Sequence, residues 1–141
     1  MMLTWGEWQE KAESSLEAAC ILLDNGKPVE AVNRAYYAAY QTVTGVLIKI
    51  GQTPRADWGN WSHDETQILF ATRICHRRQL SRKERWTLTQ QVPAFKRLLR
   101  MRYQADYGQS SLIDAAVAAP LVREAGHLIS LSRRFIRGGL L

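Results

Sequence analysis

Apolar side chains recur at every third or fourth position through most of the chain, and this spacing predicts α-helices. The first helix begins with a capping box at Thr4 and ends at Asn25-Gly26. The second begins at Pro28, a residue that suits the first helical position, and ends at Gly51. Because such a short link joins these two long helices, we expect them to lie antiparallel.

The second half of the chain predicts three further helices. Residues 51–62 are rich in Gly, Pro and Asn and show no period, so they indicate a loop, whose Trp58 and Trp61 are expected to pack back on the helices. Capping boxes at Ser62 and Ser81 open the third helix, which runs to about residue 76, and the fourth, which runs to about residue 103. A last helix follows and ends at two glycines, residues 138–139.

The last helix is expected to start where Ser111 is followed by Asp114. Two prolines fall inside the helical pattern, so Pro93 is expected to kink or split the fourth helix and Pro120 to kink the last. The side chains expected to face inward from the fourth helix are Trp86, Val92, Phe95 and Leu99. With no strand pattern or repeat, the sequence predicts one all-α domain over residues 1–141, an up-and-down bundle of about five helices.

The chain is basic, with a net charge of +6, and this charge is unevenly distributed. From Arg73 to Arg102 there are ten Lys or Arg and one acid, Glu84, so this segment carries +9 and the rest of the chain −3. A cationic band on a mildly acidic body favours a polyanionic partner such as nucleic acid, whose affinity would fall steeply with salt.

Cys20 and Cys75 each lie among apolar neighbours, and no CxxC or Cys/His spacing is present, so we expect neither a metal site nor a cofactor. Two unclustered thiols suit a reducing compartment. The first ten residues lack the features of a signal peptide, and no apolar run approaches the roughly 20 residues of a membrane span. We therefore expect a cytoplasmic protein with no membrane partner.

The densest candidate chemistry lies in the last turns of the fourth helix. Arg97, Arg100 and Arg102 lie close together with no acid among them, and a guanidinium fork matches phosphate oxygens. Arg102 and Asp106 are four residues apart and share one helical face, and Tyr107 follows. The alternative is a solvated helix face that carries one local ion pair.

Earlier helices supply three more candidates. Arg34 and Tyr37 lie on a polar edge of the largely apolar second helix, where a charged group needs a partner, either Asp106 or the nearer Glu30. His63 lies in the first turn of the third helix, a position typical of a capping residue that also attracts anions. No motif for P-loop, dinucleotide, zinc-protease or α/β-hydrolase chemistry is present.

Three of these stretches together resemble the HEPN superfamily, in its small stand-alone prokaryotic branch. They are the run Arg34-Ala-Tyr-Tyr-Ala-Ala-Tyr, the helix start Ser62-His63, and the run Arg102-Tyr-Gln-Ala-Asp106-Tyr107. The resemblance covers roughly residues 5–136. It implies a bundle of four or five helices that is usually a homodimer. An apolar or aromatic patch outside the bundle would mark the dimer surface, and the face with Trp5 and Trp8 is the expected one. Many members are metal-independent ribonucleases.

The chain departs from the ribonuclease members at one position. Their signature is an arginine followed by a histidine with four to six residues between, and after Arg102 that window holds Tyr107, Gly108 and Gln109. The pair formed by residues 123 and 127 has only three residues between and is treated as coincidence. His63 is then the remaining imidazole for acid–base chemistry.

Three interpretations follow. The protein is a metal-independent endoribonuclease of the toxin or defence type, in which a ribose 2′-hydroxyl attacks the adjacent phosphate. Alternatively it is a non-catalytic RNA- or nucleotide-binding bundle that works with a partner such as a nucleotidyltransferase antitoxin. In the third interpretation the polar residues form only a buried structural network. The expected catalytic residues are Arg102, His63, Asp106 and Tyr107, and the expected binding residues are Arg34, Tyr37, Arg97 and Arg100.

Overall fold

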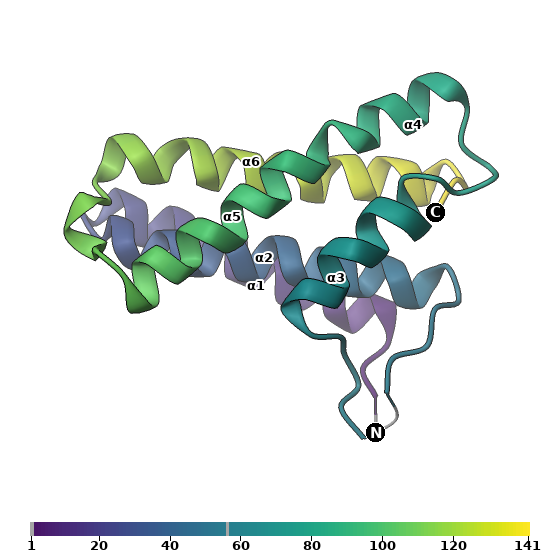
Figure 1. Cartoon of the computed structure of the whole chain (residues 1–141), viewed down its shortest axis with the longest axis horizontal. Coiled ribbons are helices and arrows are strands. Elements are labelled where there is room, and N and C mark those ends of the chain that lie inside the picture. Colours follow the sequence, from purple (N-terminus) through teal and green to yellow (C-terminus); the bar gives the residue numbers. More distant parts are fainter. Residues whose placement is uncertain (1, 56) are drawn as a thin grey trace.

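The computed structural model describes residues 2–55 and 57–141, and all regular structure in these ranges is helical. The helices are α1 (Trp5–Asp24), α2 (Pro28–Lys49), α3 (His63–Leu69), α4 (Arg82–Thr89), α5 (Gln91–Tyr107) and α6 (Ala115–Arg137). A π-helical turn, Phe70–Ile74, extends α3, and a short 3-10 turn, Ser110–Leu112, precedes α6. The predicted all-α bundle is confirmed (Figure 1).

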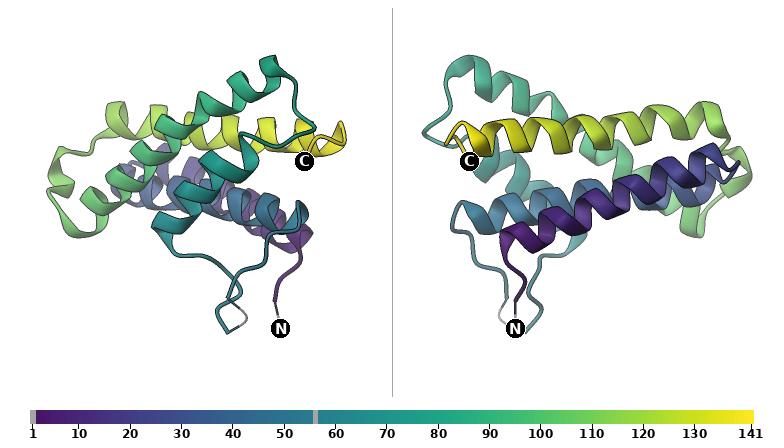
Figure 2. Two further views of the ribbon diagram at one scale, coloured as in Figure 1. Left: turned by 45° about the vertical axis from the view of Figure 1, so that its right-hand side comes forward. Right: turned by 180° about the vertical axis from the view of Figure 1, so that it is seen from behind.

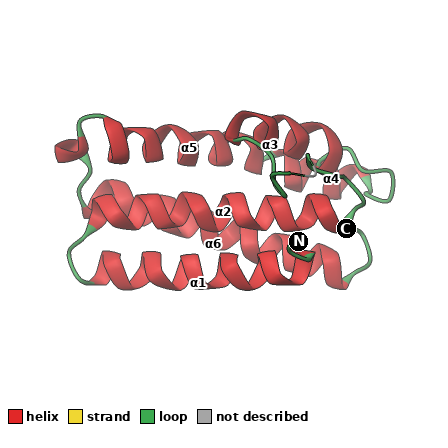
Figure 3. Cartoon of the chain, turned by 90° about the horizontal axis from the view of Figure 1, so that it is seen from below, coloured by secondary structure: helices red, strands yellow, loops and turns green. Residues whose placement is uncertain are grey.

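The centre of the bundle is α2, which contacts α1, α3, α5 and α6. Figure 3 shows α1, α2 and α6 running along one another beneath the α3, α4 and α5 side, and Figure 1 shows α5 crossing the bundle obliquely. Seen from behind, α6 and α1 cover the other side (Figure 2). Because neighbours surround α2, residues on several of its faces are buried, and small side chains such as Ala31, Ala35 and Ala38 are fully covered.

Small residues also let α1 lie close against α2. A Cβ on Gly45 would lie 3.1 Å from Cβ of Trp8 and 3.2 Å from the carbonyl oxygen of Trp5. Trp8 is buried in this contact, and Lys49 covers the ring of Trp5 at 5.6 Å from its centroid. Trp8 is therefore not available to the dimer surface that was expected at these two tryptophans.

The predicted fourth helix is split into α4 and α5 at Gln90, and Pro93 lies in the first turn of α5, where its missing N–H is not needed. The buried side chain of α4 is Leu88, whereas Trp86 is 65% exposed, so the expectation that Trp86 faces inward is wrong. At about 100° per residue Leu88 shares a helical face with Phe95, seven residues later, and Trp86 lies on the opposite face. Phe95 faces the core as expected.

Two other boundaries differ from the sequence-based expectation. The last helix is capped by Asp114, whose Oδ1 accepts a 2.9 Å hydrogen bond from the backbone N–H of Val117, and not by Ser111. From there α6 continues through Pro120 as one helix. In the loop before α3, Trp61 is buried and its carbonyl accepts from the Tyr40 hydroxyl at 2.5 Å.

Trp58, the other tryptophan of that loop, is 56% exposed, with the guanidinium of Arg55 4.9 Å above its ring. Only one of the two loop tryptophans therefore packs on the bundle. Across residues 2–55 and 57–141, none of the helices combines the length and hydrophobicity that crossing a membrane requires.

Candidate functional site

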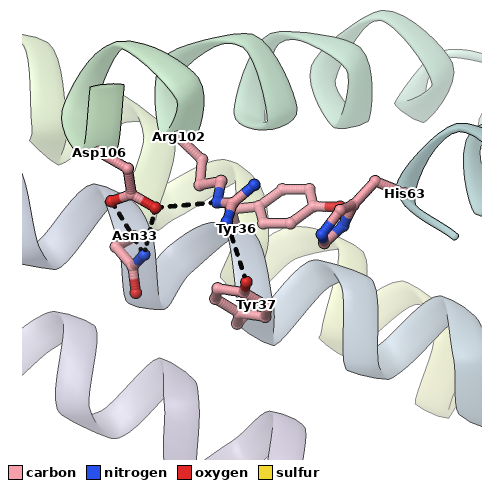
Figure 4. Close-up of polar contacts among 6 residues, drawn as sticks. All are labelled: Asn33, Tyr36, Tyr37, His63, Arg102 and Asp106. Carbon is pink, nitrogen blue, oxygen red and sulfur yellow. Dashed lines mark hydrogen bonds and ion pairs between the residues drawn. The ribbon is translucent and has the colours of Figure 1, made fainter. Parts of the chain in front are cut away.

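The oblique path of α5 lays its last turns over the first half of α2 and buries Arg102 between them, with its side chain 10% exposed. Its Nη2 donates to the Tyr37 hydroxyl at 3.2 Å, and its Nε lies 3.0 Å from Oδ2 of Asp106, although that N–H makes no hydrogen bond (Figure 4). The predicted local ion pair of Arg102 with Asp106 is present. The amide of Asn33 reaches both oxygens of the same carboxylate at 3.1 Å.

Asp106 is therefore held by Arg102 and Asn33, and the expectation that it pairs with Arg34 is wrong. The reason is position along α2. Asn33 and Tyr37 are four residues apart on one face of that helix, and this is the face that α5 covers.

Four tyrosine rings surround the Arg102 guanidinium, with centroids at cation–π distance. Their distances from its Cζ are 6.0 Å for Tyr36, 5.5 Å for Tyr37, 5.3 Å for Tyr103 and 5.7 Å for Tyr107. The two rings from α2 are covered by the bundle to differing degrees, whereas Tyr103 and Tyr107 are 47% and 74% exposed. The Arg102 guanidinium thus lies between the rings of α2 on its inner side and the solvent-accessible rings of Tyr103 and Tyr107 on its outer side.

His63 lies on the far side of Tyr36 from Arg102 (Figure 4), and its Nδ1 is 2.6 Å from the Tyr36 hydroxyl. Tyr36 is fully buried, and burial raises the pKa of its phenol, so it stays protonated. Burial, with a smaller contribution from the positive charge of Arg102, lowers the pKa of His63. Both groups are therefore neutral at pH 7, and a Tyr36 O–H donated to Nδ1 leaves the imidazole proton on Nε2.

Arg34 borders a hollow at the end of the bundle where α1, α2 and α5 meet. Its guanidinium lies 5.2 Å from the centroid of the Tyr37 ring, and its Nε is buried without a hydrogen-bond partner. The hollow measures about 560 Å³. The residues that line it are Leu22, Val29, Glu30, Asn33, Arg34, Ala105, Asp106 and Tyr107. A volume of this size accommodates a nucleotide.

Two of the expected binding residues lie elsewhere. Arg97 pairs with Glu124 of α6 on another side of α5. Arg100 borders a separate, largely apolar hollow of about 500 Å³ between α3 and α5. The structure thus brings together Arg34, Tyr37, Arg102, Asp106 and Tyr107. The ring of Tyr36 separates His63 from Arg102, and Arg97 and Arg100 lie outside this cluster.

Three residues of the cluster were not predicted as part of the site. Tyr36 and Tyr103 lie inside the quoted runs that begin at Arg34 and Arg102 but were given no role, and Asn33 lies just before the first run. One signal was available for Asn33, because it lies one turn before Tyr37 on the same helical face. Tyr103 directly follows Arg102, but only the crossing of α5 over α2 decides which way its ring turns.

In the described part of the chain, no group of three or more His, Cys, Asp or Glu is arranged to hold a metal ion. No curated protein sequence matches the chain. A family model described as HEPN domain matches residues 5–137, nearly the whole chain. With this match in addition to the helical bundle, the chain belongs to the HEPN family.

Proposed function

We propose that the protein binds RNA and that one nucleotide of the strand occupies the hollow beside Arg34. The observation that carries the proposal is the guanidinium of Arg34, whose Nε is buried without a partner next to a hollow of about 560 Å³. The guanidinium has no ion-pair partner within the described residues, and a phosphate oxygen in the hollow would supply one.

The lining residues offer complementary roles for a nucleotide. Arg34 supplies donors for the phosphate. The ring of Tyr107, 74% exposed at the rim, offers a stacking surface for the base. Glu30 has no ion-pair partner within the described residues, so its carboxylate is available to accept from a base amino group. Arg102 fixes Asp106 at the inner wall and so acts as a positioning residue.

The test is fluorescence anisotropy of a labelled single-stranded RNA with wild type, Arg34→Ala and Tyr107→Ala. Loss of a charge-assisted contact worth about 1.5 kcal/mol predicts roughly tenfold weaker binding for Arg34→Ala. Loss of stacking worth about 1–3 kcal/mol predicts a loss of at least fivefold for Tyr107→Ala, which Tyr107→Phe should restore. Lys11→Ala, an exposed change on α1, is the matched control. Equal affinity of Arg34→Ala and Lys11→Ala would contradict the proposal.

A second candidate function is metal-independent cleavage of the bound RNA, and one arrangement favours it. The Arg102 guanidinium and the His63 ring both border Tyr37, with Cζ 5.5 Å and the imidazole centroid 6.1 Å from the centroid of that ring. In this reaction the 2′-oxygen bonds to phosphorus, the bond to the 5′-oxygen breaks, and a 2′,3′-cyclic phosphate and a 5′-hydroxyl result. The protonated form of His63 would donate its Nε2 proton to the departing 5′-oxygen, while solvent takes the proton of the 2′-hydroxyl and then restores that of His63.

Cleavage is measured on a mixed RNA pool in EDTA with wild type, Arg102→Ala and His63→Ala. We expect wild type to cut and both variants to lose activity, with cyclic phosphate at the new 3′ ends. If wild type shifts the RNA without cutting it, the binding function stands and this second candidate is refuted.

A further inference from the structure

A row of exposed polar and basic side chains follows one face of α6, away from the Arg102 cluster. Its members, spaced alternately four and three residues apart so that they share one helical face, are Arg123, His127, Ser130, Arg134 and Arg137. At 1.5 Å per residue this row is about 21 Å long.

Two consecutive hollows accompany this row. The first, of about 440 Å³, lies between the start of α5 and the middle of α6, and Arg97 and Arg123 face it from the two helices. The second, of about 500 Å³, lies beside Ser130, Arg134 and Arg137. His127 borders both hollows, so they are neighbours along α6, and we call the two together the α6 groove.

The α6 groove carries positive charge that acidic side chains within the described residues neutralise only in part. Four arginines and one glutamate line it, which gives a net charge of +3 without His127 in the count. Arg97 pairs with the glutamate, Glu124. Within residues 2–55 and 57–141, Arg123, Arg134 and Arg137 have no ion-pair partner.

The neighbouring Arg133, on another face of α6, is by contrast paired with Glu13 of α1. Arginines near a helix C-terminus also offset the helix dipole, which accounts for the positions of Arg134 and Arg137. That effect falls off within the last turn, so it does not account for Arg123, fourteen residues earlier, or for Arg97 on α5.

We propose that the α6 groove holds the phosphodiester backbone of the RNA strand whose nucleotide occupies the Arg34 hollow, and this inference rests on the proposed function. Over about 21 Å a stacked strand presents about six phosphates. Guanidinium groups spaced along the groove contact some of them irrespective of sequence. The groove supplies affinity, and the Arg34 hollow supplies the contact with a base.

An RNA backbone fits the groove better than an anionic membrane does. Membrane-surface helices place large apolar side chains next to their basic ones. The exposed large apolar residues in the described ranges are Met2, Ile21, Trp58, Ile68, Trp86, Tyr103, Tyr107 and Leu112, and none of them lies on α6. The apolar residue of the second hollow, Leu131, is buried.

The test compares the salt dependence of RNA binding between two triple variants with the same loss of charge. Arg123→Gln, Arg134→Gln and Arg137→Gln together remove the groove charges. Lys11→Gln, Lys27→Gln and Lys49→Gln together remove three exposed charges from α1, α2 and the turn between them. The probe is a labelled single-stranded RNA, with anisotropy measured between about 50 and 200 mM salt. Each triple variant removes one contact with an aromatic ring, that of Arg134 with Phe135 in the first and that of Lys49 with Trp5 in the second, and circular dichroism checks that each variant folds.

Three lost phosphate contacts should reduce the slope of log K against log salt by about 2 for the groove variant, because each contact contributes about 0.7 on a single strand. The lysine variant should retain the wild-type slope within about 0.5. Equal slopes for the two variants would refute the binding of the RNA backbone in the α6 groove but would not contradict the nucleotide site at Arg34. A slope loss without any effect of Arg34→Ala would support the groove and overturn the nucleotide site.

Two further outcomes would also refute the inference. If wild type binds no RNA at all, both the proposed function and the groove are wrong. If wild type binds vesicles of phosphatidylserine, and the groove variant loses vesicle binding while its RNA salt slope stays unchanged, the groove is a lipid-binding surface instead.

Discussion

Removing the carboxylate of Asp106 should leave the buried guanidinium of Arg102 without its counter-ion. In Asp106→Ala the guanidinium keeps one hydrogen bond, to the Tyr37 hydroxyl, and the four surrounding tyrosine rings. Because its side chain is only 10% exposed, water cannot fully replace the lost carboxylate. The change therefore tests whether this pair stabilises the contact between α5 and α2.

The size of the effect follows from burial. Breaking a fully buried ion pair costs about 3–5 kcal/mol, and breaking an exposed one costs less than about 1 kcal/mol. The Asp106 side chain is 24% exposed, which places this pair between those limits, and the remaining cation–π contacts offset part of the loss. We expect Asp106→Ala to lower the free energy of unfolding by about 2 kcal/mol. For a chain of this length that corresponds to a fall in Tm of about 7 °C.

The assay is urea denaturation of wild type, Asp106→Ala, Arg102→Met and the double variant, which yields the coupling energy of the pair. The matched control is the cycle Glu13→Ala with Arg133→Met, because the side chains of that pair are 54% and 36% exposed. We expect about 2 kcal/mol for the first cycle and less than about 1 kcal/mol for the second. A coupling of Arg102 with Asp106 no larger than the control value would refute the argument from burial.

Three other predictions concern single positions. The free energy of unfolding should fall as pH drops below about 6.5, because the pKa of His63 is lowered in the folded state and the unfolded chain takes up that proton first. Thermal melts at several pH values should show a smaller loss for His63→Gln. The exposed control change His76→Gln should leave the loss as it is in wild type. Gly45→Val should lower the free energy of unfolding by about 1–3 kcal/mol in urea, because its side chain would collide with α1. A thiol reagent should modify Cys20 and spare Cys75, because Cys75 is buried and its pKa is raised to about 12; equal reaction of both in the folded protein would contradict this.

Local patterns predicted the helices well, because capping boxes and apolar spacing depend on residues within a few positions of each other. Thr4, Ser62 and Ser81 each cap a helix as expected. Trp86 was placed wrongly because it lies nine residues before Phe95, which at about 100° per residue puts it on the opposite face of the helix, whereas Leu88 shares the face of Phe95.

In the candidate site, too, the contacts that could be predicted are those between residues close together in the sequence. The pair of Arg102 with Asp106 is local and was predictable. Arg97 and Arg100 were grouped with Arg102 by proximity in sequence, but at about 100° per residue Arg102 points about 140° and 160° away from them around the helix axis. The contacts to Asn33 depend on how α5 crosses α2, which no local pattern encodes.

The long α1–α2 hairpin has a consequence for the order of folding. Its two helices are joined by a short turn and make the most extensive contact in the molecule, so their association closes a small loop and should form early. During synthesis this hairpin emerges before α5. Asn33 and Tyr37 would then be in place before Arg102 is translated, and the cluster would be completed only when α5 docks. The polar site is therefore a marker for the late steps of folding.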